Sequence, residues 1–137
     1  HVVAEIFKRY SQSRSIVVYV SDHGETLFDD KRHPDFAGHA GNTLPDNVVR
    51  IPFVVYMSDS LRKEAPELWQ QILKAQDQPV MTDLLPNIFT GLLGIETKYS
   101  RPELNVFSPQ YNPKRQRMVI AVDGAKRVFP ALHRSAQ

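Results

Sequence analysis

The sequence predicts an α/β fold in which helices cover a mostly parallel β-sheet. Two short segments, residues 15–21 and 50–57, are rich in β-branched and aromatic residues and show no alternation of apolar and polar positions. Such a strand is buried on both faces, which is typical of a parallel sheet covered by helices. The first segment directly follows an amphipathic helical pattern over residues 2–10, and together they form half of an α/β unit.

Breakers and caps delimit the elements around the second strand. Pro52 lacks an amide hydrogen, so we expect the strand over residues 50–57 to pair fully only beyond it. Ser58 can cap a short helix that runs through Leu61. Pro66 favours the start of the next helix, because proline is tolerated in a first turn.

The last third of the sequence predicts one more helix and a hairpin. Thr82 can cap the helix, and Gly94 is positioned to end it. A third strand is expected over residues 117–122. Asp123 and Gly124 follow it and favour a hairpin turn.

Composition excludes several classes of protein. The chain has 137 residues, of which 42% are hydrophobic, and this suits one globular domain or most of one. The longest apolar run, residues 16–20, is far shorter than a transmembrane helix. Cysteine is absent, so disulfides and thiolate metal sites are excluded.

Charge is unevenly distributed along the chain. Residues 1–97 carry nine basic against thirteen acidic side chains, a net charge of −4, whereas residues 98–137 carry eight against two, a net charge of +6. The basic third is either a solvated face or a surface for an anionic partner. Its cluster at residues 114–117 lacks a nucleic-acid-binding motif, so we expect no nucleic acid partner.

The residues with the clearest chemistry follow the first apolar strand. Asp22 and His23 offer a carboxylate oxygen and an imidazole nitrogen, the donors that zinc accepts, and Gly24 lets the chain turn there. Ligands bind outside the carboxyl ends of strands in open α/β sheets. The irregular stretch over residues 22–47 is long enough to favour a functional loop. The alternative is a simple turn in which Asp22 caps the following segment.

Four segments together resemble the sulfatase and alkaline-phosphatase superfamily, most closely its membrane-anchored phosphoethanolamine transferases. The first contains the Asp-His-Gly-Glu motif, and the second is a Gly-His-Ala tripeptide. The third is an apolar strand that begins after a proline, and the fourth is the helix near the end of the domain. They are residues 18–27, 38–40, 49–58 and 80–95.

The resemblance implies a role for each matching residue. Asp22 and His23 match two zinc ligands, and the site would hold one or two zinc ions. His39 matches a catalytic histidine beside the zinc, with His33 as the rival for that role. Glu25 matches a glutamate that makes a supporting contact.

The resemblance also implies that residues 1–137 are the C-terminal portion of an alkaline-phosphatase-like sandwich. The family's threonine nucleophile and an acidic metal ligand lie well upstream of the Asp-His pair, but no threonine precedes Thr26 here. We therefore expect this chain to be a fragment that is inactive alone. Its parent would be anchored in a bacterial inner membrane, with this domain facing the periplasm.

The implied reaction moves phosphoethanolamine from phosphatidylethanolamine to an envelope glycolipid such as lipid A or its core. The partners would thus be a phospholipid donor and a glycolipid acceptor. One alternative is a sulfatase-type ester hydrolase of the same superfamily, with Ca²⁺ or Mn²⁺ in place of zinc. Another is a non-catalytic module that binds the cell envelope.

Overall fold

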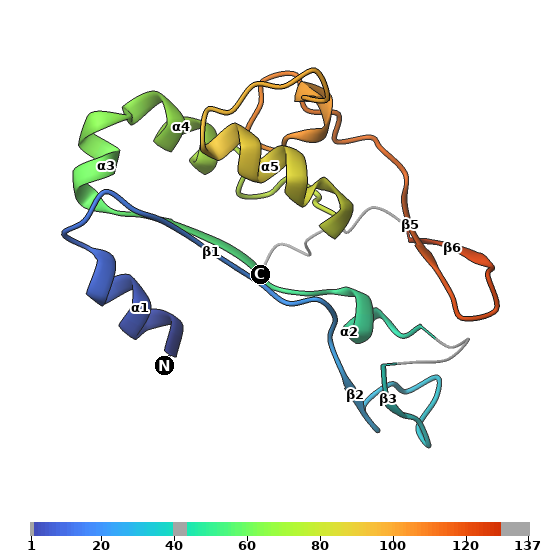
Figure 1. Cartoon of the computed structure of the whole chain (residues 1–137). Helices are drawn as coiled ribbons and strands as arrows, with labels where there is room; N and C mark the ends of the chain where they lie inside the picture. Colours follow the sequence, from blue (N-terminus) through green and yellow to red (C-terminus); the bar gives the residue numbers. More distant parts are fainter. Residues whose placement is uncertain (1, 40–43, 130–137) are drawn as a thin grey trace. The chain divides into compact units, whose positions relative to one another are not determined.

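The computed structural model of the chain describes residues 2–39 and 44–129 (Figure 1). Helices and strands are interspersed along these residues, as an α/β fold requires. The helical elements are α1 (Val2–Tyr10), α2 (Asp46–Val49), α3 (Asp59–Glu64), α4 (Pro66–Lys74), α5 (Leu85–Leu92) and the 3₁₀ turns η1 (Thr82–Leu84) and η2 (Pro102–Leu104). The strands are β1 (Ile16–Val20), β2 (Thr26–Leu27), β3 (Ala37–Gly38), β4 (Phe53–Met57), β5 (Arg117–Ile120) and β6 (Lys126–Phe129).

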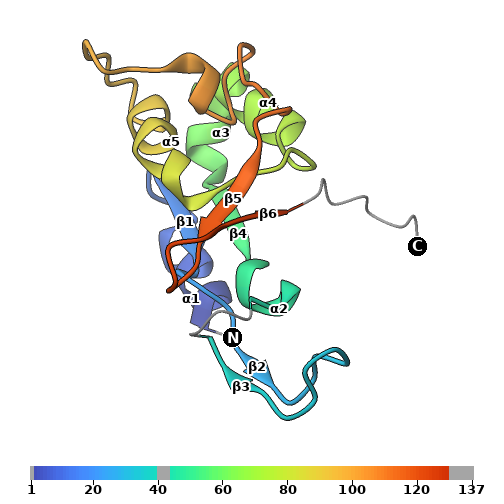
Figure 2. The ribbon, with the colours of Figure 1, turned by 90° about the vertical axis from the view of Figure 1, so that its right-hand side faces the viewer.

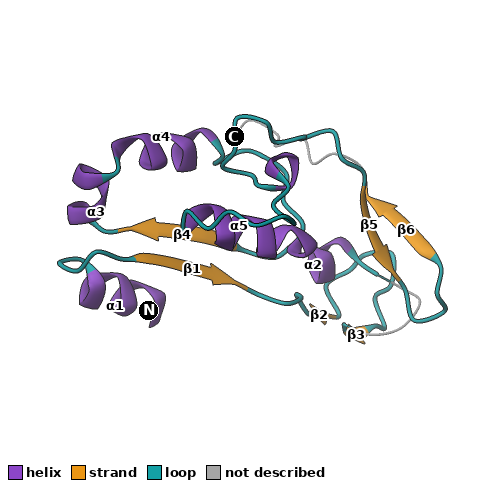
Figure 3. Cartoon of the chain, turned by 45° about the horizontal axis from the view of Figure 1, so that its top comes forward, coloured by secondary structure: helices purple, strands orange, loops and turns teal. Residues whose placement is uncertain are grey.

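The two strands that the apolar runs predict, β1 and β4, pair with each other. The amide of Ser58, just after β4, donates to the carbonyl of Ser15, just before β1 (3.0 Å). The end of one strand therefore meets the beginning of the other, and Figure 3 shows the two arrows pointing in opposite directions. This pair is antiparallel.

The expected mostly parallel sheet is not confirmed. The strand pairs β2–β3 and β5–β6 (Figure 2) are also antiparallel, so every strand pair within the described residues runs this way. A lack of alternation indicates apolar residues on both faces of a strand, but it does not report strand direction. Within this chain the burial is incomplete as well, because Tyr19 and Val54 are 43% and 39% exposed.

Most local boundaries agree with the sequence. The first helix spans Val2–Tyr10 as predicted, and β4 begins immediately after Pro52. Thr82 differs from its prediction, since it is the first residue of the 3₁₀ turn η1, whose N-cap is Met81, and the N-cap of α5 is Leu84. Gly94 follows α5 with a φ of +64°, the left-handed conformation that ends many helices. Gly124 has a φ of +77° in the turn between β5 and β6.

The chain divides into two compact units. Of the described residues, one unit contains 2–17 and 55–115, and the other contains 18–39, 44–54 and 116–129. The core of the first unit joins the end of β4 to α4, η1, α5 and the segment after η2. Its buried apolar residues are Met57, Ile72, Ala75, Leu84, Ile88, Leu92, Val106 and Phe107. No helix among the described residues has the length and apolarity to cross a membrane.

Ser58 joins the β1–β4 pair to α3 and should contribute measurably to the stability of the protein. The side chain is fully buried, and its hydroxyl accepts hydrogen bonds from the amides of Leu61 (3.4 Å) and Ser15 (3.2 Å). We expect Ser58→Ala to lower the free energy of unfolding by about 1–2 kcal/mol, because two amides lose their acceptor. Urea unfolding measures the change. Ser60→Ala, which removes only one exposed hydrogen bond to the Ser13 carbonyl (3.3 Å), serves as the control, with an effect within about 0.5 kcal/mol. Equal stability of the two variants would contradict this role.

Candidate metal centre

The chain leaves β1 through a turn that contains Asp22 and His23. Oδ1 of Asp22 accepts a hydrogen bond from the His23 amide (3.0 Å), and the Ser21 hydroxyl donates to the His23 carbonyl (2.7 Å). The Gly24 amide then donates to the carbonyl of Val48 (2.7 Å). The turn is thus held by its own side chains and by α2.

Asp22 and His23 direct their side chains toward each other. Oδ2 of Asp22 lies 3.7 Å from Nε2 of His23. Nδ1 of His23 lies 2.8 Å from the carbonyl oxygen of Gly24, and because a carbonyl only accepts, Nδ1 carries the hydrogen and Nε2 presents its lone pair. The hydrogen bond from the His23 amide holds the pKa of Asp22 below its ordinary value, so this carboxylate stays charged at neutral pH.

The β2–β3 hairpin brings His39 next to His23. The register pairs Thr26 with Gly38 and Leu27 with Ala37, so Glu25 and His39 are the next residues to face each other across the strands. Nδ1 of His39 donates to Oε2 of Glu25 at 2.8 Å. The ring of His39 also stacks on that of His23, with 3.9 Å between centroids and 22° between planes.

These contacts bring together a donor set that suits a divalent transition metal. One ligand atom each from His23, Glu25 and His39 lies within 4.8 Å of the others. Asp22 is not part of this group, but its Oδ2 lies 3.7 Å from Nε2 of His23. Two imidazoles and carboxylates are zinc donors, and two ligands of one tetrahedral zinc lie roughly 3.4 Å apart, since each bond is about 2.1 Å. The side chains of His23, Glu25 and His39 are partly exposed and that of Asp22 is 88% exposed, so they can adjust to an ion. The residues present therefore fit zinc.

Glu25 was expected to make a supporting contact, and its hydrogen bond to His39 is such a contact. It also lies within ligand distance of both histidines, which the sequence reasoning did not foresee. The position of Glu25 follows from the β2–β3 hairpin, because the pairing of these two short strands places Glu25 opposite His39. Ala40, the last residue of the tripeptide that contains His39, lies outside the described residues.

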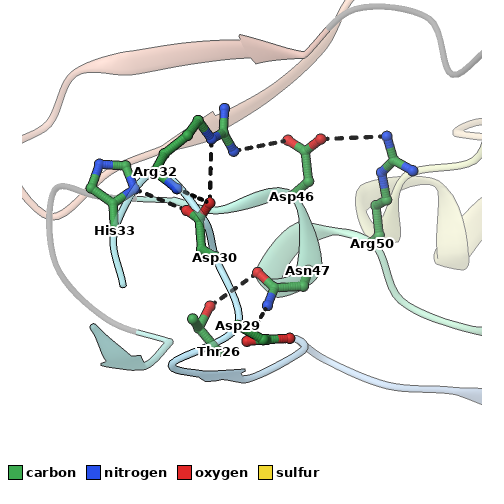
Figure 4. A network of polar contacts seen from close by, with 8 residues as sticks. All are labelled: Thr26, Asp29, Asp30, Arg32, His33, Asp46, Asn47 and Arg50. Carbon is green, nitrogen blue, oxygen red and sulfur yellow. Dashed lines mark hydrogen bonds and ion pairs between the residues drawn. The ribbon is translucent and has the colours of Figure 1, made fainter. Parts of the chain in front are cut away.

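His33, the rival for the role of His39, is engaged elsewhere. Its Nδ1 lies 2.9 Å from Oδ2 of Asp30, whose side chain is only 9% exposed (Figure 4). This hydrogen bond and that from the Arg32 amide hold the pKa of Asp30 below its ordinary value. Among the described residues, the structure thus groups His39, and not His33, with His23.

Its donor atoms make the site a candidate binding centre for a divalent metal in an α/β fold. A family model described as sulfatase matches residues 1–95, more than two thirds of the chain. The chain therefore belongs to the sulfatase family.

Curated relatives narrow the comparison to one branch of the family. The chain is 33% identical over 85 residues to the phosphoethanolamine transferase EptA of Escherichia coli strain K12, which covers 61% of this chain and 15% of that protein. It is 32% identical over 59 residues to the Kdo(2)-lipid A phosphoethanolamine 7''-transferase of Salmonella typhimurium, covering 43% of this chain and 10% of the relative. The matched part of this chain thus corresponds to a minor portion of each relative's length.

Solved structures show the same fold. The C-terminal periplasmic domain of EcEptC from Escherichia coli superimposes with a TM-score of 0.75 over 87% of this chain and 33% of that one, at 24% identity. The same domain in a complex with zinc also has a TM-score of 0.75. These matches establish a mixed α/β fold like that of the periplasmic domain.

Proposed function

We propose that this chain is the C-terminal, metal-binding part of a zinc-dependent phosphoethanolamine transferase. The donor would be phosphatidylethanolamine, and the acceptor would be lipid A or its core. The complete domain would be an alkaline-phosphatase-like sandwich on the periplasmic side of a bacterial inner membrane. The part that precedes this chain's sequence in the relatives would supply the threonine nucleophile and an acidic metal ligand.

The observation that carries the proposal is the convergence of His23, Glu25 and His39, with the carboxylate of Asp22 beside His23 at the end of β1. The curated relatives are phosphoethanolamine transferases, one of them acting on Kdo(2)-lipid A, and a domain of the same fold has been solved in complex with zinc. A set of zinc donors on this fold supports a reaction that transfers phosphoethanolamine. It favours this activity over a non-catalytic envelope-binding module.

The four side chains of the site would have different roles in the transfer reaction. Zinc bound here would supply a Lewis acid that withdraws charge from a phosphate ester. Asp22 and Nε2 of His23 would hold the ion, because the first is charged and the second presents a lone pair. His39 would give a proton to the leaving oxygen or take one from the acceptor hydroxyl at Nε2, since its Nδ1 is bonded to Glu25. Glu25 would orient that ring through Oε2, as carboxylates beside histidines do in metal sites, and would add a carboxylate donor for the ion.

The activity is tested on the full-length protein in detergent. The protein is incubated with phosphatidylethanolamine and lipid A, and mass spectrometry follows the appearance of phosphoethanolamine on the acceptor. Zinc-dependent transfer supports the proposal. Hydrolysis of an aryl sulfate without transfer would instead identify a sulfatase, and the absence of both activities would favour the non-catalytic module.

The role of His39 gives a sharper prediction. We expect His39→Ala to lower the transfer rate at least about 100-fold, because a positioned acid or base commonly contributes this much. His33→Ala is the matched control and should retain most of the activity, since His33 is hydrogen-bonded to Asp30 outside the cluster. Steady-state rates at saturating donor measure both. Full activity of His39→Ala would refute the role of this residue.

A further inference from the structure

The hairpin that carries Glu25 is fastened to α2 by side chains that the proposed mechanism does not use. The Thr26 side chain is fully buried, and its hydroxyl donates to Oδ1 of Asn47 at 3.0 Å (Figure 4). Nδ2 of Asn47 donates in turn to Oδ1 of Asp29 at 3.0 Å. The same Asp29 oxygen accepts the amide of Leu27 at 2.9 Å, which holds the pKa of Asp29 below its ordinary value. One amide side chain therefore bridges Thr26, the first residue of β2, and Asp29, which lies two residues beyond the end of the strand.

Backbone contacts also hold Gly24, the residue before Glu25, against the same turn of α2. The Gly24 amide donates to Val48, and a Cβ on Gly24 would lie 1.9 Å from the carbonyl oxygen of Asn47. Gly24 separates His23 from Glu25 in the sequence, so the backbone between these two donor residues packs against α2. The relative position of the two donors is thus set by residues 24–26 and their contacts with Asn47 and Val48.

We propose that Asn47, acting through Thr26 and Asp29, is a positioning residue that holds His23 and the Glu25–His39 pair at the separation a metal ion needs. The inference rests on the proposed function, since it assumes that the cluster binds zinc. The chemistry demands an amide, because Asn47 both accepts from a hydroxyl and donates to a carboxylate. An aspartate at this position accepts only, and it would face the charge of Asp29.

The test measures zinc affinity of the full-length protein by competition with a chromophoric chelator. We expect Asn47→Asp to weaken zinc binding about 10-fold or more, the usual effect of removing a residue that orients metal ligands. Asn112→Asp makes the same change of charge at a position whose oxygen accepts a backbone amide, and it should leave the affinity unchanged. The absorption spectrum of the cobalt-substituted protein should change in Asn47→Asp alone, because it reports the geometry of the ligands.

Thr26 variants separate positioning from a general loss of structure. Thr26→Val removes the hydroxyl at nearly constant shape and should weaken zinc binding as Asn47→Asp does, whereas Thr26→Ser keeps the hydroxyl and should restore most of the affinity. Wild-type zinc affinity in both Asn47→Asp and Thr26→Val would overturn the inference and leave the proposed function standing. A wild-type protein that binds no zinc would overturn both.

Discussion

Replacing Asp22 or His23 by alanine is expected to abolish tight zinc binding and with it the transfer reaction. Each variant removes one donor from a pair whose Oδ2 and Nε2 atoms lie 3.7 Å apart. Loss of a direct ligand costs more than loss of an orienting group, so we expect zinc affinity to fall by at least about 100-fold. Elemental analysis of the purified full-length protein gives the metal content, and the transfer assay gives the rate.

The control for these variants comes from the same loop. Asp30→Ala removes an acidic side chain that binds His33 and Arg32, and not the cluster, so its zinc content should match that of the wild type. Unchanged zinc content in both Asp22→Ala and His23→Ala would refute the ligand assignment. Loss of zinc with full transfer activity would show instead that the reaction does not depend on this metal.

Gly24→Ala is expected to destabilise the loop that forms the site, although it adds a single methyl group. That group would lie 1.9 Å from the backbone carbonyl oxygen of Asn47, and backbone cannot rotate away as a side chain can. We expect a loss of about 2–3 kcal/mol in the free energy of unfolding, in the range of an overpacked buried contact. Zinc affinity should fall at least about 10-fold, because the path between His23 and Glu25 must shift.

Gly94→Ala is the matched control for this substitution. Its added methyl meets no atom within 4 Å, but the φ of +64° is strained for alanine, so we expect a cost of about 1 kcal/mol. This variant should bind zinc as the wild type does. Urea unfolding and chelator competition compare the two glycines. A Gly24→Ala protein with wild-type stability and affinity would show that the loop can move away from α2 without consequence.

Local sequence signals were sufficient for the parts of the fold that depend on neighbouring residues. The apolar run before Asp22 indicated β1, and Pro52 indicated where β4 begins pairing, because proline has no amide to donate. The same logic placed Asp22 and His23 at the end of a strand, where the structure has them. The family motif then indicated His39, although 15 residues separate it from His23.

The sequence alone therefore determined the class of chemistry: a carboxylate and an imidazole at the end of an apolar strand, with no cysteine available as a ligand. Only the tertiary structure decided the direction of the β1–β4 pair, the pairing of His33 with Asp30, and the approach of Glu25 to His23 and His39. The reason is physical. Strand direction and register depend on hydrogen bonds between segments far apart in the chain, and no short run of residues specifies which partner those bonds will find.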